Sequence, residues 1–152
     1  MKTLILIKPD AINRGLVGEL ISRFEKKGLK IVGLKMLKMT PSMAKEHYAH
    51  LVDKSFYPEL EEFMTSNPLI AMVVEGKDAV NVVRRIVGLT NGREAEPGSI
   101  RGDYSISVSK NLIHASDSEE TAKKEVARFF KEDEMFNYTL SYENYLYSSD
   151  EL

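Results

Sequence analysis

Four short apolar segments have the pattern expected of β-strands. Leu4–Ile7 and Leu69–Val74 are continuous apolar runs, which is typical of strands buried on both faces. Ile31–Met39 alternates apolar residues with lysines, as an edge strand does to avoid pairing with other chains. Leu112–His114 predicts a short last strand. The two most apolar strands, the first and the third, are therefore expected in the middle of a sheet.

Helical periodicity fills the intervals between these strands. Gly28 lies where a left-handed cap would end the first helix. Ser116-Asp117-Ser118-Glu119 matches a capping box ahead of the last helix, with Ser116 and Glu119 as the capping pair. The predicted helices cover about 13–27, a short segment beginning at Pro41, about 58–65, about 78–87, and a last segment carrying Ala122, Val126, Phe129 and Phe130.

The order of these elements predicts an α+β fold. Placing the first and third strands centrally gives the spatial order 2-3-1-4, which is the ferredoxin-like split βαβ sandwich: a four-stranded antiparallel sheet covered by helices. We expect the helices on one face of the sheet. No linker or repeat divides the 152 residues, so the chain is predicted to form a single domain over 1–152. Residues 88–100 lack periodicity, and a loop of that length in a small domain is usually functional or disordered.

Composition excludes several classes of protein. Hydrophobic residues make up 43% and charged residues 29%, as in an ordinary globular chain. The net charge of −2 gives no general attraction to nucleic acid or to anionic membranes, so neither is expected as an obligatory partner. The absence of cysteine excludes disulfides and thiolate chemistry. No apolar stretch approaches the roughly 20 residues of a membrane span, and the cytoplasm is the predicted compartment.

His114 is the most unusual candidate for chemistry. It ends an apolar strand directly before a helix N-terminus, where free N–H groups favour an anion. A histidine there can act as nucleophile or acid–base group toward phosphate. Glu125 falls about 40° outside the apolar arc of the last helix, so its carboxylate needs a partner, and His114 is a candidate. A carboxylate that accepts one imidazole N–H leaves the other nitrogen free to attack.

Structural explanations compete with each of these assignments. A lone histidine at a strand end is more often structural, and Glu125 could pair with Lys124 or Arg128 on the helix surface. His47 and His50 are three residues apart with no evident third ligand, so we interpret them as structural or surface residues and predict no protein metal site. Walker and Rossmann phosphate motifs are absent.

Taken together, the ordered motifs resemble the nucleoside diphosphate kinase family. The resemblance runs from Leu4 to about Phe130. Its blocks are Lys8-Pro9-Asp10, Arg14-Gly15-Leu16-Val17-Gly18, Arg23-Phe24-Glu25, His47-Tyr48, 68–76, Gly88-Leu89-Thr90-Asn91, Pro97-Gly98-Ser99-Ile100-Arg101-Gly102-Asp103 and Asn111-Leu112-Ile113-His114-Ala115-Ser116-Asp117-Ser118.

This resemblance implies a ping-pong transfer of the γ-phosphate from a nucleoside triphosphate to a nucleoside diphosphate. Nδ1 of His114 would be the nucleophile and Glu125 would hold the other nitrogen, with Lys8 and Tyr48 beside them. It also implies Mg²⁺ bound mainly through water and nucleotide oxygens, and a homo-oligomer, namely a hexamer built from dimers. The implied nucleotide-binding residues are Lys8, Phe56, Arg84, Thr90, Arg101 and Asn111, with Phe56 stacking on the base.

Three departures from the family pattern are visible. Ala115 replaces a common glycine, Asn91-Gly92 replaces a common Asn-Pro, which is expected to loosen the loop, and the chain has no tryptophan. The alternative functions are a non-catalytic ferredoxin-like module that binds nucleotide or nucleic acid, and a silent member of the family. Pure binding does not require the combination of His114 with Glu125. The silent member is disfavoured by the intact set of site residues, which are Lys8, Tyr48, Arg84, Thr90, Arg101, Asn111 and His114.

Overall fold

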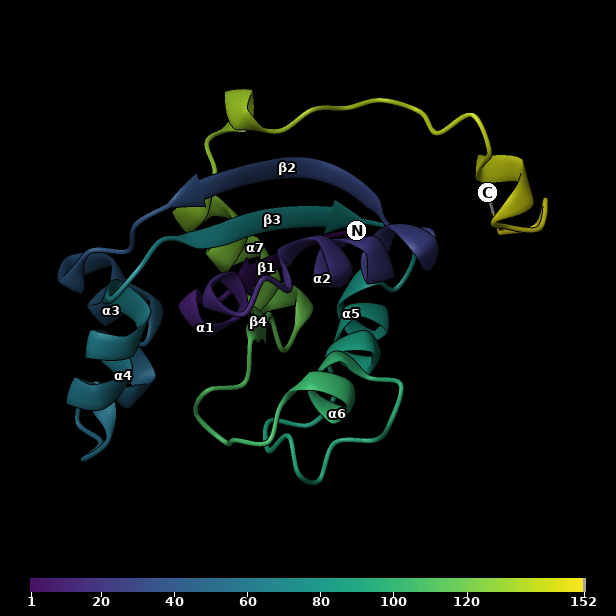
Figure 1. Ribbon diagram of the computed structural model, residues 1–152. Coiled ribbons are helices and arrows are strands. Elements are labelled where there is room, and N and C mark those ends of the chain that lie inside the picture. Colours follow the sequence, from purple (N-terminus) through teal and green to yellow (C-terminus); the bar gives the residue numbers. More distant parts are fainter. Residues whose placement is uncertain (152) are drawn as a thin grey trace.

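A four-stranded antiparallel sheet forms the centre of the computed structural model, which describes residues 1–151 (Figure 1). The strands are β1 (Lys2–Ile7), β2 (Lys30–Leu37), β3 (Leu69–Glu75) and β4 (Ile113–Ala115). The helices are α1 (Pro9–Asn13), α2 (Val17–Lys26), α3 (Pro41–His47), α4 (Tyr57–Thr65), α5 (Ala79–Val87), α6 (Ile100–Tyr104) and α7 (Glu119–Phe129), with 3-10 turns η1 (Ala49–Leu51), η2 (Glu132–Glu134) and η3 (Glu143–Tyr145).

The strand order β2-β3-β1-β4 confirms the predicted order and the ferredoxin-like α+β class. Every pair is antiparallel, and β1 lies between β3 and β4. Directly opposed residues in such a pair point to the same face of the sheet. The register of β1 with β4 opposes Leu6 to His114, so His114 projects from the face that carries Leu6.

Helices cover both faces of this sheet, so the expectation of one covered face was wrong. Ile5 and Ile7 pack with α2 and α5 on one face. Leu4 and Leu6 pack with α3, α4 and α7 on the other. The reason lies in β1 itself, because side chains 3–7 are all buried and a strand that is apolar on both faces needs cover on both. The side chain of His114 therefore faces α7.

The helix predicted over about 13–27 corresponds to α2, which begins later, at Val17, and the short helix α1 before it was not predicted. Pro9 occupies the first turn of α1, where a proline loses no hydrogen bond. Gly15, with φ of 67°, turns the chain between the two helices. Gly28 has φ of 95° after α2, which confirms the predicted left-handed cap.

The long loop after α5 is held in place although it lacks the expected proline. A Cβ on Gly92 would lie 2.3 Å from the carbonyl oxygen of Ser105, so only glycine fits this close approach of two backbones. The Gly92 N–H also donates to the carbonyl of Ser107 (3.3 Å). The loop is thus fixed against the segment that follows α6, beside the site described below.

The C-terminal segment runs along the outer edge of β2 (Figure 1). The Phe136 N–H donates to the carbonyl of Val32 (2.8 Å), and Lys30 Nζ donates to the carbonyl of Tyr138 (2.9 Å). Lys30 also pairs with Glu75 (3.0 Å). The bond from Phe136 satisfies one backbone carbonyl of the β2 edge, which would otherwise be open for pairing.

Candidate active site

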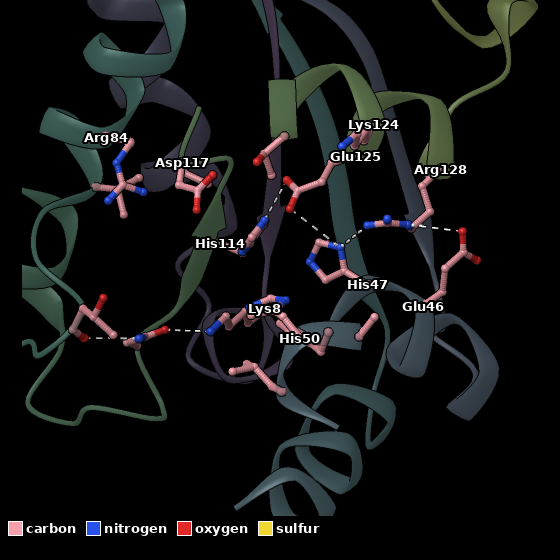
Figure 2. Close-up of a pocket in the computed structure, with 18 of the residues that line it drawn as sticks. Lys8, Glu46, His47, His50, Arg84, His114, Asp117, Lys124, Glu125 and Arg128 are labelled. Carbon is pink, nitrogen blue, oxygen red and sulfur yellow. Dashed lines mark hydrogen bonds and ion pairs between the residues drawn. The ribbon is translucent and has the colours of Figure 1, made fainter. Parts of the chain in front are cut away.

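A cavity of about 670 Å³ opens beside β4 and the start of α7 (Figure 2). The structure brings together around it every predicted site residue except Phe56. Phe56 lies ahead of α4 with 52% of its surface exposed and does not line the cavity. The predicted residues that line it are Lys8, Tyr48, Arg84, Thr90, Arg101, Asn111, His114 and Glu125.

His114 and Glu125 meet because strand register and helix position act together. β4 directs His114 toward α7, and Glu125 lies on the inner side of α7. The His114 Nε2 atom lies 2.9 Å from Glu125 Oε2. Since the carboxylate accepts, Nε2 carries the proton and Nδ1 keeps its lone pair. The His114 side chain is 22% exposed, so this ring is accessible from the cavity.

Glu125 is held as a buried carboxylate. It is only 5% exposed, and burial alone would raise its pKa, but hydrogen bonds from His114 and Ser116 outweigh burial and lower the pKa to about 2. The Ser116 Oγ donates to the same Oε2 atom at 2.6 Å. The alternative pairing on the helix surface is wrong, since Lys124 pairs with Glu120 and Arg128 with Glu46.

Ser116 is a site residue that sequence reasoning assigned incorrectly. The N-cap of α7 is Ser118, whose Oγ accepts from the Thr121 N–H (3.1 Å). Both serines are favourable N-cap residues, but only Ser116 is followed three residues later by a glutamate, so the capping-box pattern favours Ser116 over the true cap. A signal was available nevertheless, because Ser116 follows His114 by two residues in extended chain, and such residues share a face.

His47 is a second residue whose position was not anticipated. It is buried at 5% exposure, and its ring packs edge-on against the ring of His114, with 4.6 Å between centroids. Arg128 Nη1 lies 3.2 Å from His47 Nδ1. Burial, and then the neighbouring His114, lower the pKa of His47 to about 3, so this ring is neutral. Its place depends on how α3 packs against α7, which no local pattern encodes.

The donor atoms of His47, His114 and Glu125 lie within 4.8 Å of one another, a spacing that a metal ion could bridge. Hydrogen bonds join His114 to Glu125 and Arg128 to His47, and the two histidine rings pack edge-on. The positive charge of Arg128 against His47 opposes a cation there. We interpret the cluster as the support that orients His114, through its hydrogen bond to Glu125 and ring packing from His47.

Two buried cations line the cavity beside this network. Lys8 Nζ donates to Asn111 Oδ1 (2.8 Å), and burial followed by repulsion from Arg101 lowers the pKa of Lys8 to about 8. Burial and then Arg84 lower the pKa of Arg101 to about 10. Arg84 projects from the end of α5 toward the cavity (Figure 2). This concentration of positive charge suits an anionic ligand.

Arg101 also ties the walls of the cavity together. Its guanidinium donates to the carbonyls of Asn111 (3.2 Å), Gly88 (3.1 Å) and Ile113 (2.6 Å). A guanidinium has five N–H groups, so two remain for a ligand. Asn111 Nδ2 donates to the Thr90 carbonyl (3.2 Å), which joins the segment before β4 to the long loop.

Tyr48 ends the predicted set. It follows α3 at 6% exposure, its hydroxyl is buried without a hydrogen-bond partner, and burial raises its pKa. An unpartnered buried hydroxyl is costly unless a ligand or a water completes it. Its position on the cavity wall makes it available to a bound group.

Comparison with known proteins identifies the family. The family model described as nucleoside diphosphate kinase matches residues 1–135. A nucleoside diphosphate kinase from Parabacteroides distasonis is 52% identical over 150 residues, covering 99% of this chain and 98% of the relative. The chain belongs to the nucleoside diphosphate kinase family. A relative with this name from Staphylothermus marinus is 57% identical over 137 residues, covering 90% and 97%.

Solved structures agree with this family assignment. A halophilic nucleoside diphosphate kinase from Halobacterium salinarum in complex with CDP superimposes with a TM-score of 0.95 at 42% identity, covering 97% of this chain and 99% of that one. Nucleoside diphosphate kinases are phosphotransferases, so the catalytic interpretation is supported over a non-catalytic binding module.

The two serines provide a test of the network around Glu125. Ser116→Ala should lower the free energy of unfolding by about 1.5–3 kcal/mol at neutral pH, because a buried carboxylate loses a donor. A carboxyl group whose pKa is lower in the folded state stabilises the fold at any pH above its ordinary, unfolded-state pKa. This stabilisation is lost as the pH falls toward and through the folded-state pKa. The loss of unfolding free energy in Ser116→Ala, relative to the wild type, should therefore shrink as the pH falls from about 5 toward 2. Urea unfolding of both proteins at several pH values measures this difference.

Ser118→Ala is the matched control. It removes a helix cap and should cost about 1 kcal/mol, with little dependence on pH over the same range. A deficit of Ser116→Ala that stays constant on acidification would contradict its bond to ionised Glu125.

Proposed function

We propose that this chain transfers the γ-phosphate of a nucleoside triphosphate to a nucleoside diphosphate through a phosphohistidine on His114. The observation that carries the proposal is the His114–Glu125 pair at 2.9 Å, which leaves Nδ1 free in a cavity lined by Lys8, Arg84 and Arg101. A nucleophile braced by a carboxylate and facing cations is the arrangement that phosphoryl transfer needs.

The first half-reaction follows from this geometry. The Nδ1 lone pair attacks the γ-phosphorus of the nucleoside triphosphate. The bond from that phosphorus to the β,γ-bridging oxygen breaks, and the nucleoside diphosphate leaves with the electron pair. The ring gains positive charge, which the Glu125 carboxylate stabilises through Nε2–H. In the second half-reaction a terminal oxygen of a new diphosphate attacks the phosphohistidine, and the electron pair returns to Nδ1.

The nucleotide-binding roles are part of the proposal. The free N–H groups of Arg84 and Arg101 and the Thr90 hydroxyl would hold phosphates, while Lys8 and Asn111 would reach the sugar hydroxyls. The exposed ring of Phe56 would stack on the base. Stacking on one aromatic face tolerates any base, which predicts weak discrimination among nucleotides.

Enzymes of this family need a divalent cation, and we propose Mg²⁺. The cavity fits a cation that arrives with the nucleotide, because several cations line its wall and Asp117 places a carboxylate on the side of Arg84 (Figure 2). When bound, Mg²⁺ would neutralise phosphate oxygens. Asp117 would meet it directly or through water.

A homo-oligomer, a hexamer of this chain, is part of the same proposal. Large apolar side chains are exposed on the monomer: Leu34 and Met36 on β2, and Leu89 and Ile106 in the loops around α6, the last at 81%. Sedimentation equilibrium should give about six times the monomer mass, and Ile106→Glu should reduce it; a monomeric wild-type chain would refute the assembly.

The compartment and the wider partners stay predictions. Within residues 1–151, the structure has no helix long and apolar enough to cross a bilayer. The cytoplasm remains the predicted location, and no obligatory nucleic-acid partner is proposed.

Labelling tests the nucleophile. Incubation with ATP labelled at the γ-phosphate should give an acid-labile, base-stable phosphoprotein, and His114→Ala should abolish the label. His50→Ala, which changes an exposed histidine at the rim of the cavity, should keep it. Label that persists in His114→Ala at wild-type level would assign the phosphoryl group to another residue.

Lys8 predicts an alkaline limit to activity. Its charged form predominates below its pKa of about 8, so kcat/KM for the nucleotide should fall as the pH rises through that value, since kcat/KM reports the free enzyme. Bound phosphates favour the charged ammonium, so kcat should hold to higher pH. Steady-state rates from pH 6 to about 10 measure both kcat and kcat/KM. If kcat/KM stays level up to about pH 10, where Arg101 begins to lose its charge, the role of Lys8 is contradicted.

A further inference from the structure

Leu112 has a backbone conformation that its side chain does not favour. Its φ is 72°, in the left-handed region that glycine adopts readily and bulky residues rarely do. The Leu112 side chain is fully buried in the core beside Ile113 and Ile100. Glycine would leave that space empty, so leucine stays and other groups must hold the backbone.

The segment after β1 holds both ends of the Leu112 residue. The Lys8 backbone N–H donates to the Leu112 carbonyl (2.9 Å). The Leu112 N–H donates to the carboxylate Oδ2 of Asp10 (3.1 Å), in the first turn of α1. The second contact joins residues 102 positions apart in the sequence, and it is made by a side chain.

This turn sets the direction of the groups on either side of it. Asn111 before it meets Lys8 Nζ with its side-chain oxygen, and Ile113 after it enters the strand that carries His114. Arg101 bonds the carbonyls on both sides of Leu112. A change at Leu112 would therefore reach the proposed sugar-binding, phosphate-binding and nucleophilic groups together.

Asp10 also acts on the cations by its charge. Within residues 1–151, neither Lys8 nor Arg101 forms an ion pair. The charged groups that act on Lys8 are Arg101 from α6 and Asp10 from α1, and of these two only Asp10 raises the pKa of Lys8. His47 from α3 is neutral. It raises the pKa of Arg101 as well. The other carboxylate oxygen of Asp10 is buried without a partner.

We propose that Asp10 is a positioning residue for phosphoryl transfer, because its carboxylate fixes the Leu112 peptide and places negative charge beside Lys8 and Arg101. This inference rests on the proposed function, since it assigns to Asp10 the task of arranging the same site. Asp10 itself touches no reacting atom. A purely structural aspartate would affect folding alone and would leave the pH profile of the folded enzyme unchanged.

Two substitutions separate the two tasks. Asp10→Ala removes both the acceptor and the charge, whereas Asp10→Asn keeps an acceptor for the Leu112 N–H and removes only the charge. Asp133→Asn, on the exposed turn η2, is the matched control. The full-length proteins are compared by hydrogen exchange at the Leu112 amide, by the rate of His114 labelling in a single turnover, and by the pH profile of kcat/KM.

In Asp10→Ala, exchange at Leu112 should speed up about tenfold or more, and labelling of His114 should slow by about 10- to 100-fold, as misplacement of reacting groups does. Asp10→Asn should keep most of the amide protection, yet its alkaline loss of kcat/KM should move to lower pH, because the group that raises the Lys8 pKa is gone. Asp133→Asn should match the wild type in all three measurements.

The outcomes are distinguishable. Wild-type and Asp133→Asn proteins that carry no label on His114 would refute the proposed function itself. If both are labelled and the Asp10 variants match them in rate and pH profile, the proposed function stands and the inference about Asp10 is overturned. An unchanged pH profile in Asp10→Asn, with slow labelling only in a destabilised Asp10→Ala, would likewise overturn it.

Discussion

The site depends on one hydrogen bond, between the carboxylate of Glu125 and the ring of His114. A charge buried to this degree is tolerated only when its oxygens are paired, and both the imidazole and Ser116 donate to one oxygen of Glu125. The pairing works in both directions. The donors keep Glu125 ionised, and the ionised carboxylate fixes which ring nitrogen carries the proton. The hydrogen bond between His114 and Glu125 therefore both stabilises the buried carboxylate on α7 and orients the nucleophile on β4.

The opposite wall of the cavity has the reverse arrangement. Lys8 and Arg101 are buried cations that bond to neutral amide oxygens, so their charges remain largely uncompensated. Such groups lower the stability of the empty protein, but they are already oriented when an anion arrives and need no reorganisation. The pKa values of both residues are lowered because their charged forms are disfavoured in the empty site. A bound phosphate would favour the charged forms and raise both pKa values.

The elements that the sequence predicted well are those with a local physical cause. Continuous apolar runs identified β1 and β3 as central strands, and helical periodicity placed Glu125 at the border of the core. Tertiary packing decided the rest. The capping-box pattern favoured Ser116, and the true start of α7 at Ser118 is set by packing. His47 enters the site because α3 packs against the sheet face that His114 shares, a contact that its neighbours in sequence do not reveal.

The backbone at Leu112 shows why the site cannot be separated from the core. Its side chain anchors the turn in the same cluster as Ile5 and Ile7, while its peptide groups bond to the segment that carries Lys8. Core packing therefore requires a side chain the size of leucine, whereas the turn requires a positive φ, which is unfavourable for leucine. The conflict is stable only while several groups hold the peptide at once. Because several groups fix the turn at Leu112, this turn fixes the positions of Arg101, Asn111 and Lys8, which bond to the residues around it.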